Sequence, residues 1–312
     1  MGGESALRGV LPPALAAEVK RALAAAGDDT PLQRAFHVGG GDINHSARVE
    51  TAQAAYFVKW HSAPPPRFFE CEAAGLRLLA EVGVRRAGAG FRVPQVIGSG
   101  AVPGERAAFL VLSWIEARGG KSAHAAETLG RGLALLHRQT APRYGLDHDN
   151  YIGRLPQPNR ESTSWVAFYR DQRLGAQRDL AARAGLLPER RARRLERLMA
   201  RLDEWIDERL CRPSPLHGDL WGGNWLVDAD GSPVLIDPAV YYGDREADLA
   251  MTALFGGFPA AFYDAYEEVY PLAPGHQQRQ DLYKLYYLLC HLNLFGEGYG
   301  GSVDSILQRY VG

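Results

Sequence analysis

The segment from His217 to Asp237 constrains the fold of this chain more than any other stretch. Asn224 follows Asp219 by five residues, and Asp237 comes after two further short apolar runs. These runs flank the turn-forming sequence Asp228–Gly231, which is the pattern of a β-hairpin. Because a hairpin returns the chain to its starting end, we expect Asn224 and Asp237 to lie next to each other.

Two carboxylates and an amide that converge in this way suit phosphoryl transfer from ATP to a hydroxyl group. That reaction needs a carboxylate to accept the hydroxyl proton and oxygen ligands to hold Mg²⁺ on the phosphates. Protein kinases place the base and the asparagine at the same spacing, with a metal-binding aspartate on a later strand. We therefore predict Asp219 as the catalytic base and Asn224 and Asp237 as metal ligands. Ordinary loop residues would explain each position alone, but not all three at this spacing.

The composition is that of an ordinary globular protein, with 312 residues, of which 46% are hydrophobic and 23% charged. Its 35 basic and 36 acidic side chains nearly cancel, so no overall field favours nucleic acid or an anionic membrane. Three scattered cysteines suggest neither a disulfide framework nor a zinc site. The sequence shows no signal-peptide apolar region and no apolar run as long as a membrane span. We therefore expect a cytoplasmic protein with no nucleic-acid or membrane partner.

The first third of the chain predicts a small, β-rich unit. An alanine-rich helix over residues 4–26 is followed by strand candidates near 36–38, 46–50, 56–60, 93–99 and 107–114. The turn between the first two strands contains Gly39, Gly40 and Gly41. Consecutive glycines let backbone N–H groups approach an anion closely, which suits a phosphate. A merely flexible turn would have the same composition.

Lys59 ends the apolar strand after the glycine turn, where kinases carry their phosphate-binding lysine. A helix is expected over residues 67–81, and Glu72 lies on its inward, apolar face. An unpaired charge would be unfavourable there, so we predict an ion pair between Lys59 and Glu72. The neighbouring Glu70 faces solvent and is the less suitable partner. Glu72 could alternatively serve only to stabilise the N-terminus of its helix.

The fifth strand leads into a glycine-rich link that we interpret as a hinge between two lobes. Adenine would pair with exposed backbone groups there, at Ser113 and Ile115, although an ordinary loop fits the same residues. Beyond the hinge the chain is mainly helical, apart from the hairpin and a long loop at 144–159, with helices expected at about 161–182 and 188–209. Loops of that length in compact domains are often functional. We interpret the basic run 190–197 of the second helix as a solvated face, and His137, which ends an earlier helix, as structural. We predict an α+β, protein-kinase-like fold, with a β-rich N-lobe over residues 1–114 and a mainly helical C-lobe over residues 115–312.

Longer motifs resemble those of the fructosamine (ketosamine) kinases, which are relatives of the aminoglycoside and choline kinases. The resemblance is carried by HGDLWGGNW at 217–225, LIDPAVYYGDREADLAMTALFGGF at 235–258 and HLNLFGEGY at 291–299. It implies that ATP and Mg²⁺ bind between the lobes, and that the acceptor is a glycated amine or a glycated lysine of a protein. Phosphorylation at the third carbon of the sugar would be a repair step, because the product sheds the sugar spontaneously.

By position, the resemblance implies the same roles for Asp219, Asn224, Asp237 and Lys59, with Glu72 orienting the lysine. Trp221, beside the base, would offer its flat face to the sugar, or would simply pack the loop.

Two other functions stay open at this stage. The acceptor could be a cationic metabolite such as an aminoglycoside or choline, which would call for a cluster of carboxylates near Asp219. The stretch containing Asp244, Glu246 and Asp248 could be mistaken for such a cluster. We expect Asp248 instead to accept backbone N–H groups beneath the catalytic loop. A nucleotide-binding pseudoenzyme is the third possibility, and the presence of every expected catalytic residue type argues against it.

Overall fold

The computed structural model describes residues 9–39, 44–117 and 120–312. Its N-terminal part contains a five-stranded antiparallel sheet in the order β1-β2-β3-β5-β4. The strands are β1 (Arg34–His37), β2 (His45–Glu50), β3 (Ala55–His61), β4 (Val96–Ala101) and β5 (Ala108–Ser113). The five strands that the sequence predicted are therefore present, with ends that differ by a few residues.

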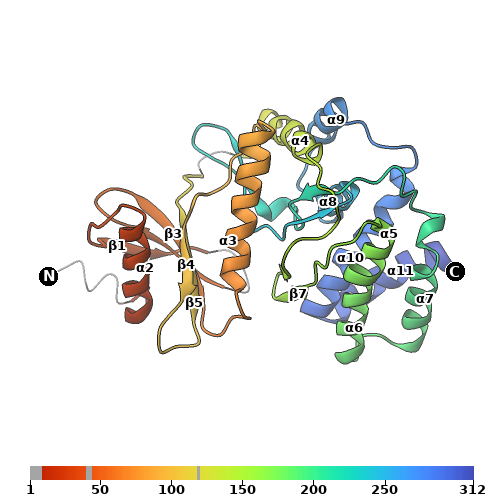
Figure 1. Ribbon diagram of the computed structural model, residues 1–312, viewed down its shortest axis with the longest axis horizontal. Helices are drawn as coiled ribbons and strands as arrows, with labels where there is room; N and C mark the ends of the chain where they lie inside the picture. Colours follow the sequence, from red (N-terminus) through yellow and green to blue (C-terminus); the bar gives the residue numbers. More distant parts are fainter. Residues whose placement is uncertain (1–8, 40–43, 118–119) are drawn as a thin grey trace.

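The sheet lies between two helices, α2 (Pro13–Ala25) and α3 (Phe68–Leu78), as Figure 1 shows. Proline at the first position suits the start of α2. Leu15, Val19 and Leu23 recur every fourth residue and bury one face of this helix against the sheet. The earliest part of the helix expected over 4–26 falls outside the described residues.

Helix α3 covers the opposite face of the sheet. Successive side chains of a strand point to opposite sides, so neighbouring residues of β5 contact different helices. Phe69 and Leu76 of α3 pack against Leu110 and Leu112 of β5, whereas Val111 of β5 faces the α2 side. This packing over β5 brings the inward face of α3 within reach of Lys59 on the neighbouring strand β3.

The prediction that this helix ends before Gly83 is wrong. The chain continues as a π-helical segment, η1 (Leu79–Arg86), within which the missing side chain of Gly83 makes room for an aromatic ring. A Cβ at this position would lie only 2.7 Å from Phe91 Cζ. Through Leu79 and Val82, η1 packs into the hydrophobic core of the C-lobe rather than against the sheet.

The basic, glycine-rich composition of residues 84–92 predicts a solvated loop, and most of this stretch is exposed, but residues 84–86 belong to η1 and Ala89 and Phe91 are buried. The Arg92 N–H donates to the Pro233 carbonyl (2.8 Å), and the Leu235 N–H donates to the Arg92 carbonyl (2.9 Å). Its guanidinium also contacts the Asp228 carboxylate at 2.8 Å. The segment after η1 is thus attached to the predicted catalytic hairpin.

The C-lobe is built from helices around two cores rich in leucine and aromatic side chains. The 20-residue α10 (His276–Phe295) crosses one of these cores, with Leu282, Tyr286 and Leu289 buried. The other helices are α4 (Ala123–His137), α5 (Trp165–Phe168), α6 (Ala176–Arg183), α7 (Glu189–Met199), α8 (Glu246–Leu254), α9 (Ala260–Val269) and α11 (Gly300–Val311). In the described part of the chain, no helix combines the length and apolarity needed to span a membrane.

Two helices differ from expectation. The helix expected over 161–182 begins at Trp165 and passes through the π-helical segment η2 (Tyr169–Gly175) before α6. The helix expected over 188–209 ends at Met199, because Leu202 and Ile206 turn into the core on an irregular segment. The basic α7 is also only partly solvated, since Arg191 is buried against Glu297 and Asp304.

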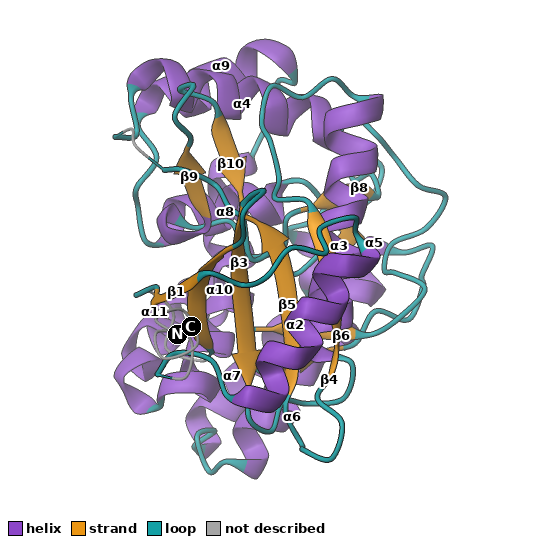
Figure 2. Cartoon of the chain, turned by 90° about the vertical axis from the view of Figure 1, so that its left-hand side faces the viewer, coloured by secondary structure: helices purple, strands orange, loops and turns teal. Residues whose placement is uncertain are grey.

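Three short antiparallel strand pairs complete the C-lobe. They are β6 (Asn150–Ile152) with β7 (Leu155–Gln157), β8 (Ser214–Leu216) with β11 (Tyr241–Gly243), and β9 (Trp225–Val227) with β10 (Pro233–Leu235). Figure 2 shows β9 and β10 beneath α4 and α9. The first pair forms within the long loop at 144–159, and the last pair is the predicted catalytic hairpin.

Candidate active site

The β9–β10 hairpin brings Asn224 and Asp237 together, as predicted. Trp225 is paired with Leu235, and the Ile236 N–H donates to the Asn224 carbonyl at 3.0 Å. The turn is fixed by Asp228, whose side chain accepts N–H groups of the residues that follow it. Asn224 and Asp237 therefore leave adjacent ends of two paired strands, toward the same space.

The loop before the hairpin is held from below by Asp248, which confirms its expected structural role. Its carboxylate accepts the backbone N–H groups of His217 (2.7 Å) and Gly218 (2.8 Å). Gly218 has φ +83°, and a Cβ there would lie 2.0 Å from the Ala239 carbonyl oxygen. Only glycine allows this close approach of two backbones. His137, expected to be structural, is fully buried with Nε2 at 3.3 Å from Asp248.

Asp219 follows this anchored turn, with its side chain next to Asn224. The Asn224 amide donates to the Asp219 backbone carbonyl (2.8 Å) and to its carboxylate (3.2 Å). Burial raises the pKa of Asp219 to about 7, and the charges of Asp237 and Asp248 add to the rise, whereas the Asn224 hydrogen bond opposes it. A carboxylate with a pKa near neutrality is well suited to accept a proton from an alcohol.

Lys59 reaches the same place from β3 and confirms the predicted ion pair. Its ammonium lies 3.0 Å from Glu72 Oε1 and also 2.7 Å from Asp237 Oδ1. Burial alone would lower the pKa of Lys59, but the two carboxylates, Asp237 first, more than reverse this and keep the lysine charged. Because one ammonium serves two carboxylates, burial still raises the pKa of Glu72 to about 7.

Among the three carboxylates, Asp237 is the one whose pKa is lowered. Burial works to raise it, yet the contact with Lys59 outweighs burial. Its backbone has φ 52°, in the left-handed region that residues other than glycine rarely occupy. Strained backbone of this kind persists where the surrounding structure imposes it, often at functional sites.

The five side chains predicted to bind the nucleotide and metal or to act as base in this region line one cavity of about 330 Å³. Asp219, Asn224, Asp237, Lys59 and Glu72 share it with Trp221. Trp221 is 41% exposed, and its ring lies against Gly223, where any Cβ would collide with it. The residues proposed as base, metal ligands and phosphate ligand thus converge, and the expected sugar-stacking tryptophan lies at the edge of the same space.

The structure describes only some of the N-lobe residues that were predicted to contact the nucleotide. Gly39 lies beside the β1–β2 connection, where the Val38 N–H donates to the Ser46 carbonyl, while Gly40 and Gly41 fall outside the described residues. The Ser113 N–H donates to the Gln95 carbonyl at 2.9 Å, so adenine could use only the Ser113 carbonyl oxygen. Pairing of adenine with the backbone of Ser113 and Ile115 stays a prediction.

Several lining residues were not singled out by sequence reasoning. Asn44 places a buried amide oxygen at the cavity with no hydrogen-bond partner among the described residues. It lies three residues after Gly41, and the nearby glycine turn was the available signal. Another wall is half aromatic and carries no acidic side chain, lysine or arginine; it comprises Tyr151, Ile152 and Gly153 of the long loop together with His291, Leu294 and Phe295 of α10. The loop length and the motif at 291–299 both pointed to this wall without naming its members.

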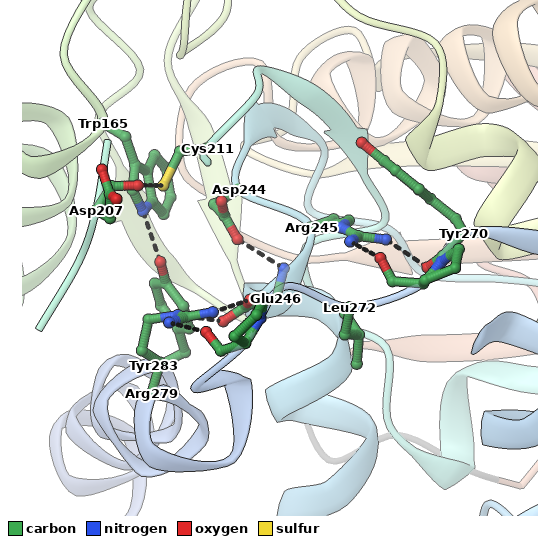
Figure 3. Close-up of polar contacts among 12 residues, drawn as sticks. Trp165, Asp207, Cys211, Asp244, Arg245, Glu246, Tyr270, Leu272, Arg279 and Tyr283 are labelled. Carbon is green, nitrogen blue, oxygen red and sulfur yellow. Dashed lines mark hydrogen bonds and ion pairs between the residues drawn. The ribbon is translucent and has the colours of Figure 1, made fainter. Parts of the chain in front are cut away.

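The carboxylates of Asp244 and Glu246 do not reach this cavity. Glu246 forms a two-pronged ion pair with Arg279, at 2.7 and 2.8 Å, and Asp244 accepts the Glu246 N–H at 2.9 Å (Figure 3). Trp165 and Tyr283 close the same cluster with a hydrogen bond of 2.9 Å. These acidic groups stabilise the interior of the C-lobe, and none of them is available to an acceptor in the cavity.

Comparison with known families agrees with this geometry. The family model described as fructosamine kinase matches residues 15–312. The chain belongs to the fructosamine kinase family. Two curated members illustrate the relationship. The probable ketoamine kinase of Lactiplantibacillus plantarum is 45% identical over 281 residues, covering 90% of this chain and 95% of that protein. The chloroplastic protein-ribulosamine 3-kinase of Arabidopsis thaliana is 38% identical over 289 residues, covering 91% and 85%.

Solved structures extend the comparison to the fold. A candidate fructosamine-3-kinase from Thermobifida fusca YX-ER1 has a TM-score of 0.81 and is 34% identical in sequence. The match covers 94% of the present chain and 97% of the Thermobifida chain. An aminoglycoside phosphotransferase bound to ADP and hygromycin B has a TM-score of 0.60 at 14% identity, covering 94% and 98%. At 14% identity, the similarity to the aminoglycoside phosphotransferase shows a shared fold only. The predicted α+β, protein-kinase-like architecture, with a β-rich N-lobe and a mainly helical C-lobe, is confirmed.

Proposed function

We propose that this protein is an ATP- and Mg²⁺-dependent ketosamine 3-kinase, which phosphorylates the 3-hydroxyl of the sugar in a fructosamine or ribulosamine. The observation that carries the proposal is the convergence of Asp219, Asn224, Asp237 and Lys59 on one cavity of a fructosamine kinase family member. Asp219 would accept the proton of the sugar hydroxyl, and its pKa near 7 suits that task. Lys59, held by Glu72, would bind the phosphates.

The residues at the end of the hairpin fit a magnesium ion that arrives with the nucleotide. Mg²⁺ prefers oxygen ligands and is commonly held by one or two protein side chains together with substrate phosphates. Asp237 supplies a carboxylate and Asn224 an amide oxygen, since the amide nitrogen of Asn224 already faces Asp219. No group of three His, Cys, Asp or Glu side chains within the described ranges could hold a metal by itself. When bound, the ion would neutralise charge on the transferred phosphate.

The acceptor side of the cavity favours a sugar derivative over a polycation. The charged lining residues among those described are Lys59, Glu72, Asp219 and Asp237, all of which belong to the phosphate and base end. An aminoglycoside carries several ammonium groups and would find no further carboxylates. A sugar ring, in contrast, presents apolar C–H faces that pack well on an aromatic side chain such as Trp221.

Choline is a second candidate acceptor, because aromatic side chains also bind quaternary ammonium groups.

An acceptor screen with purified protein, ATP and Mg²⁺ separates these functions. We expect phosphate transfer to ribulosyl- or fructosyl-lysine, free or within a peptide, followed by release of the sugar; phosphorus NMR would show the 3-phosphate. Turnover of choline or kanamycin without turnover of any ketosamine would refute the proposal. Transfer to a glycated protein would support a protein substrate. We also propose a cytoplasmic location, which cell fractionation would test.

A further inference from the structure

The hairpin of β6 and β7 forms a connection between the lobes that is separate from the hinge. The Tyr151 hydroxyl donates to the Pro66 carbonyl at 2.9 Å, and the Tyr151 ring lies 5.3 Å from the Phe68 ring. The Cys71 thiol donates to the Asp149 carbonyl, with 3.6 Å between sulfur and oxygen. Each of these contacts joins the C-lobe hairpin to α3 or to the segment that leads into it, and α3 carries Glu72.

The base of this hairpin is attached rigidly to the chain that follows Asp237. The Asn150 amide donates to the Val240 carbonyl (2.8 Å), and the Gln157 amide donates to Asn150 (2.8 Å) and to the Ala239 carbonyl (3.1 Å). The Tyr286 hydroxyl of α10 donates to Gln157 (2.7 Å). All of these groups belong to buried residues, and the side-chain amides of Asn150 and Gln157 are hydrogen-bonded; such networks resist deformation.

Helix α3 is therefore held against the C-lobe at three levels. Tyr151 contacts its N-terminal end. Gly75 approaches Val240 closely, since a Cβ at this glycine would lie 3.2 Å from Val240 Cγ2. The continuation η1 packs into the C-lobe core through Leu79. Glu72 lies between the first and second of these levels, facing Lys59 at 3.0 Å.

We propose that Tyr151 is a positioning residue for phosphate binding: through its contact with α3, it keeps Glu72 against Lys59. This inference rests on the proposed function, in which Lys59 binds the phosphates of ATP. Tyr151 also lines the cavity together with Gly153. One hairpin thus forms part of the acceptor wall and supports the phosphate-binding pair. An acceptor that packs against this wall stabilises α3, so acceptor and nucleotide should each increase the affinity of the other.

Nucleotide affinity measured without any acceptor is the decisive test. Tyr151→Phe removes the hydroxyl but keeps the ring contact with Phe68, and Tyr151→Ala removes both. Calorimetric titration with Mg²⁺ and a non-hydrolysable ATP analogue should show affinity about threefold lower for Tyr151→Phe, the size expected for one exposed hydrogen bond. Tyr151→Ala should lose about tenfold or more, because the aromatic pair is lost as well. Hydrogen exchange over residues 68–75 should be faster in both variants.

Two further variants separate positioning from general packing. Tyr263→Phe removes a hydroxyl that donates to Thr252 at 3.2 Å inside the C-lobe, and it should leave nucleotide affinity unchanged. Glu72→Gln combined with Tyr151→Ala should lower the affinity by less than the product of the single effects, because both changes disrupt the same pair.

Unchanged nucleotide affinity and unchanged exchange of α3 in Tyr151→Ala would overturn the inference, even if the KM of the acceptor rose; Tyr151 would then be only a wall of the cavity. Because no acceptor is present in the titration, the result does not depend on ketosamines being the substrate. A Tyr151 effect in a protein that is inactive on ketosamines would refute the proposed function and leave this inference standing.

Discussion

Replacing Asp219 by asparagine should remove turnover and yet stabilise the nucleotide-free protein. The pKa of Asp219 rises from 3.8 to about 7, because burial and the charges of Asp237 and Asp248 disfavour the ionised carboxylate. At neutral pH the folded protein therefore holds a charge that the unfolded chain carries more easily. Asparagine has nearly the same shape, cannot ionise, and still offers an oxygen to the Asn224 amide.

The size of the effect follows from the pKa difference. A shift of about three units corresponds to about 4 kcal/mol, at 1.36 kcal/mol per unit. Since Asp219 lines an open cavity and solvent screens its charge, we expect about 1–2 kcal/mol. The pKa in the folded state lies above that in the unfolded state, so the penalty is absent below about pH 4, grows between pH 4 and pH 7, and is constant above that. The stability gained by Asp219→Asn should depend on pH in the same way.

Thermal unfolding in EDTA without nucleotide measures this difference. At pH 7.5 the midpoint of Asp219→Asn should lie about 2–5 °C above that of the wild type, and the two should coincide near pH 4. Asp264→Asn, at an exposed position of α9, is the matched control and should show no such trend. Turnover should fall by a factor of about 10²–10⁴, with the affinity for Mg-ATP retained. A destabilised variant, or a gain that does not vary with pH, would refute the electrostatic argument, and near-normal turnover would refute the assignment of the base.

Three further substitutions test other parts of the site. Asp237→Ala should weaken Mg-ATP binding about tenfold or more in calorimetric titration, because it removes a charged metal ligand, and unchanged affinity would exclude that role. Lys59→Met leaves the Glu72 and Asp237 carboxylates facing each other, so it should raise the KM for ATP about tenfold or more and lower the unfolding midpoint; an unaltered KM would contradict phosphate binding. Gly218→Ala should reduce stability by about 2 kcal/mol or more and reduce kcat, because its Cβ would collide with the Ala239 carbonyl; a stable, active variant would show that this loop can shift.

The parts of the site that follow from local sequence were predictable. The hairpin that joins Asn224 to Asp237 depends on a turn and two short strands, and both can be read from neighbouring residues. The Lys59–Glu72 pair depends on helical periodicity, because the side chain of Glu72 shares a face with apolar neighbours. Chemistry then restricts the partner, since a buried lysine needs a carboxylate.

Features that depend on distant segments were not predictable. Gly83 resembles a helix stop, but its missing side chain instead makes room for Phe91, a requirement that only tertiary packing reveals. The Ser113 N–H is already occupied by Gln95 because of the way β4 pairs with β5, with an irregular register between Val96 and Gly98. The aromatic wall of the cavity joins a loop to α10, and no local pattern connects these two segments.

The unequal charges around the cavity have a consequence for the ligand before it makes any contact. Glu72, Asp219 and Asp237 can contribute three negative charges, against the single positive charge of Lys59. A recess with surplus negative charge repels anions from a distance, and low-dielectric walls strengthen that field. ATP stripped of its cations is itself strongly anionic, so the empty enzyme should discriminate against it and admit the nucleotide chiefly with its counterions attached. Ionic strength and free magnesium would then govern how often the enzyme captures a nucleotide, even where they leave the chemical step untouched.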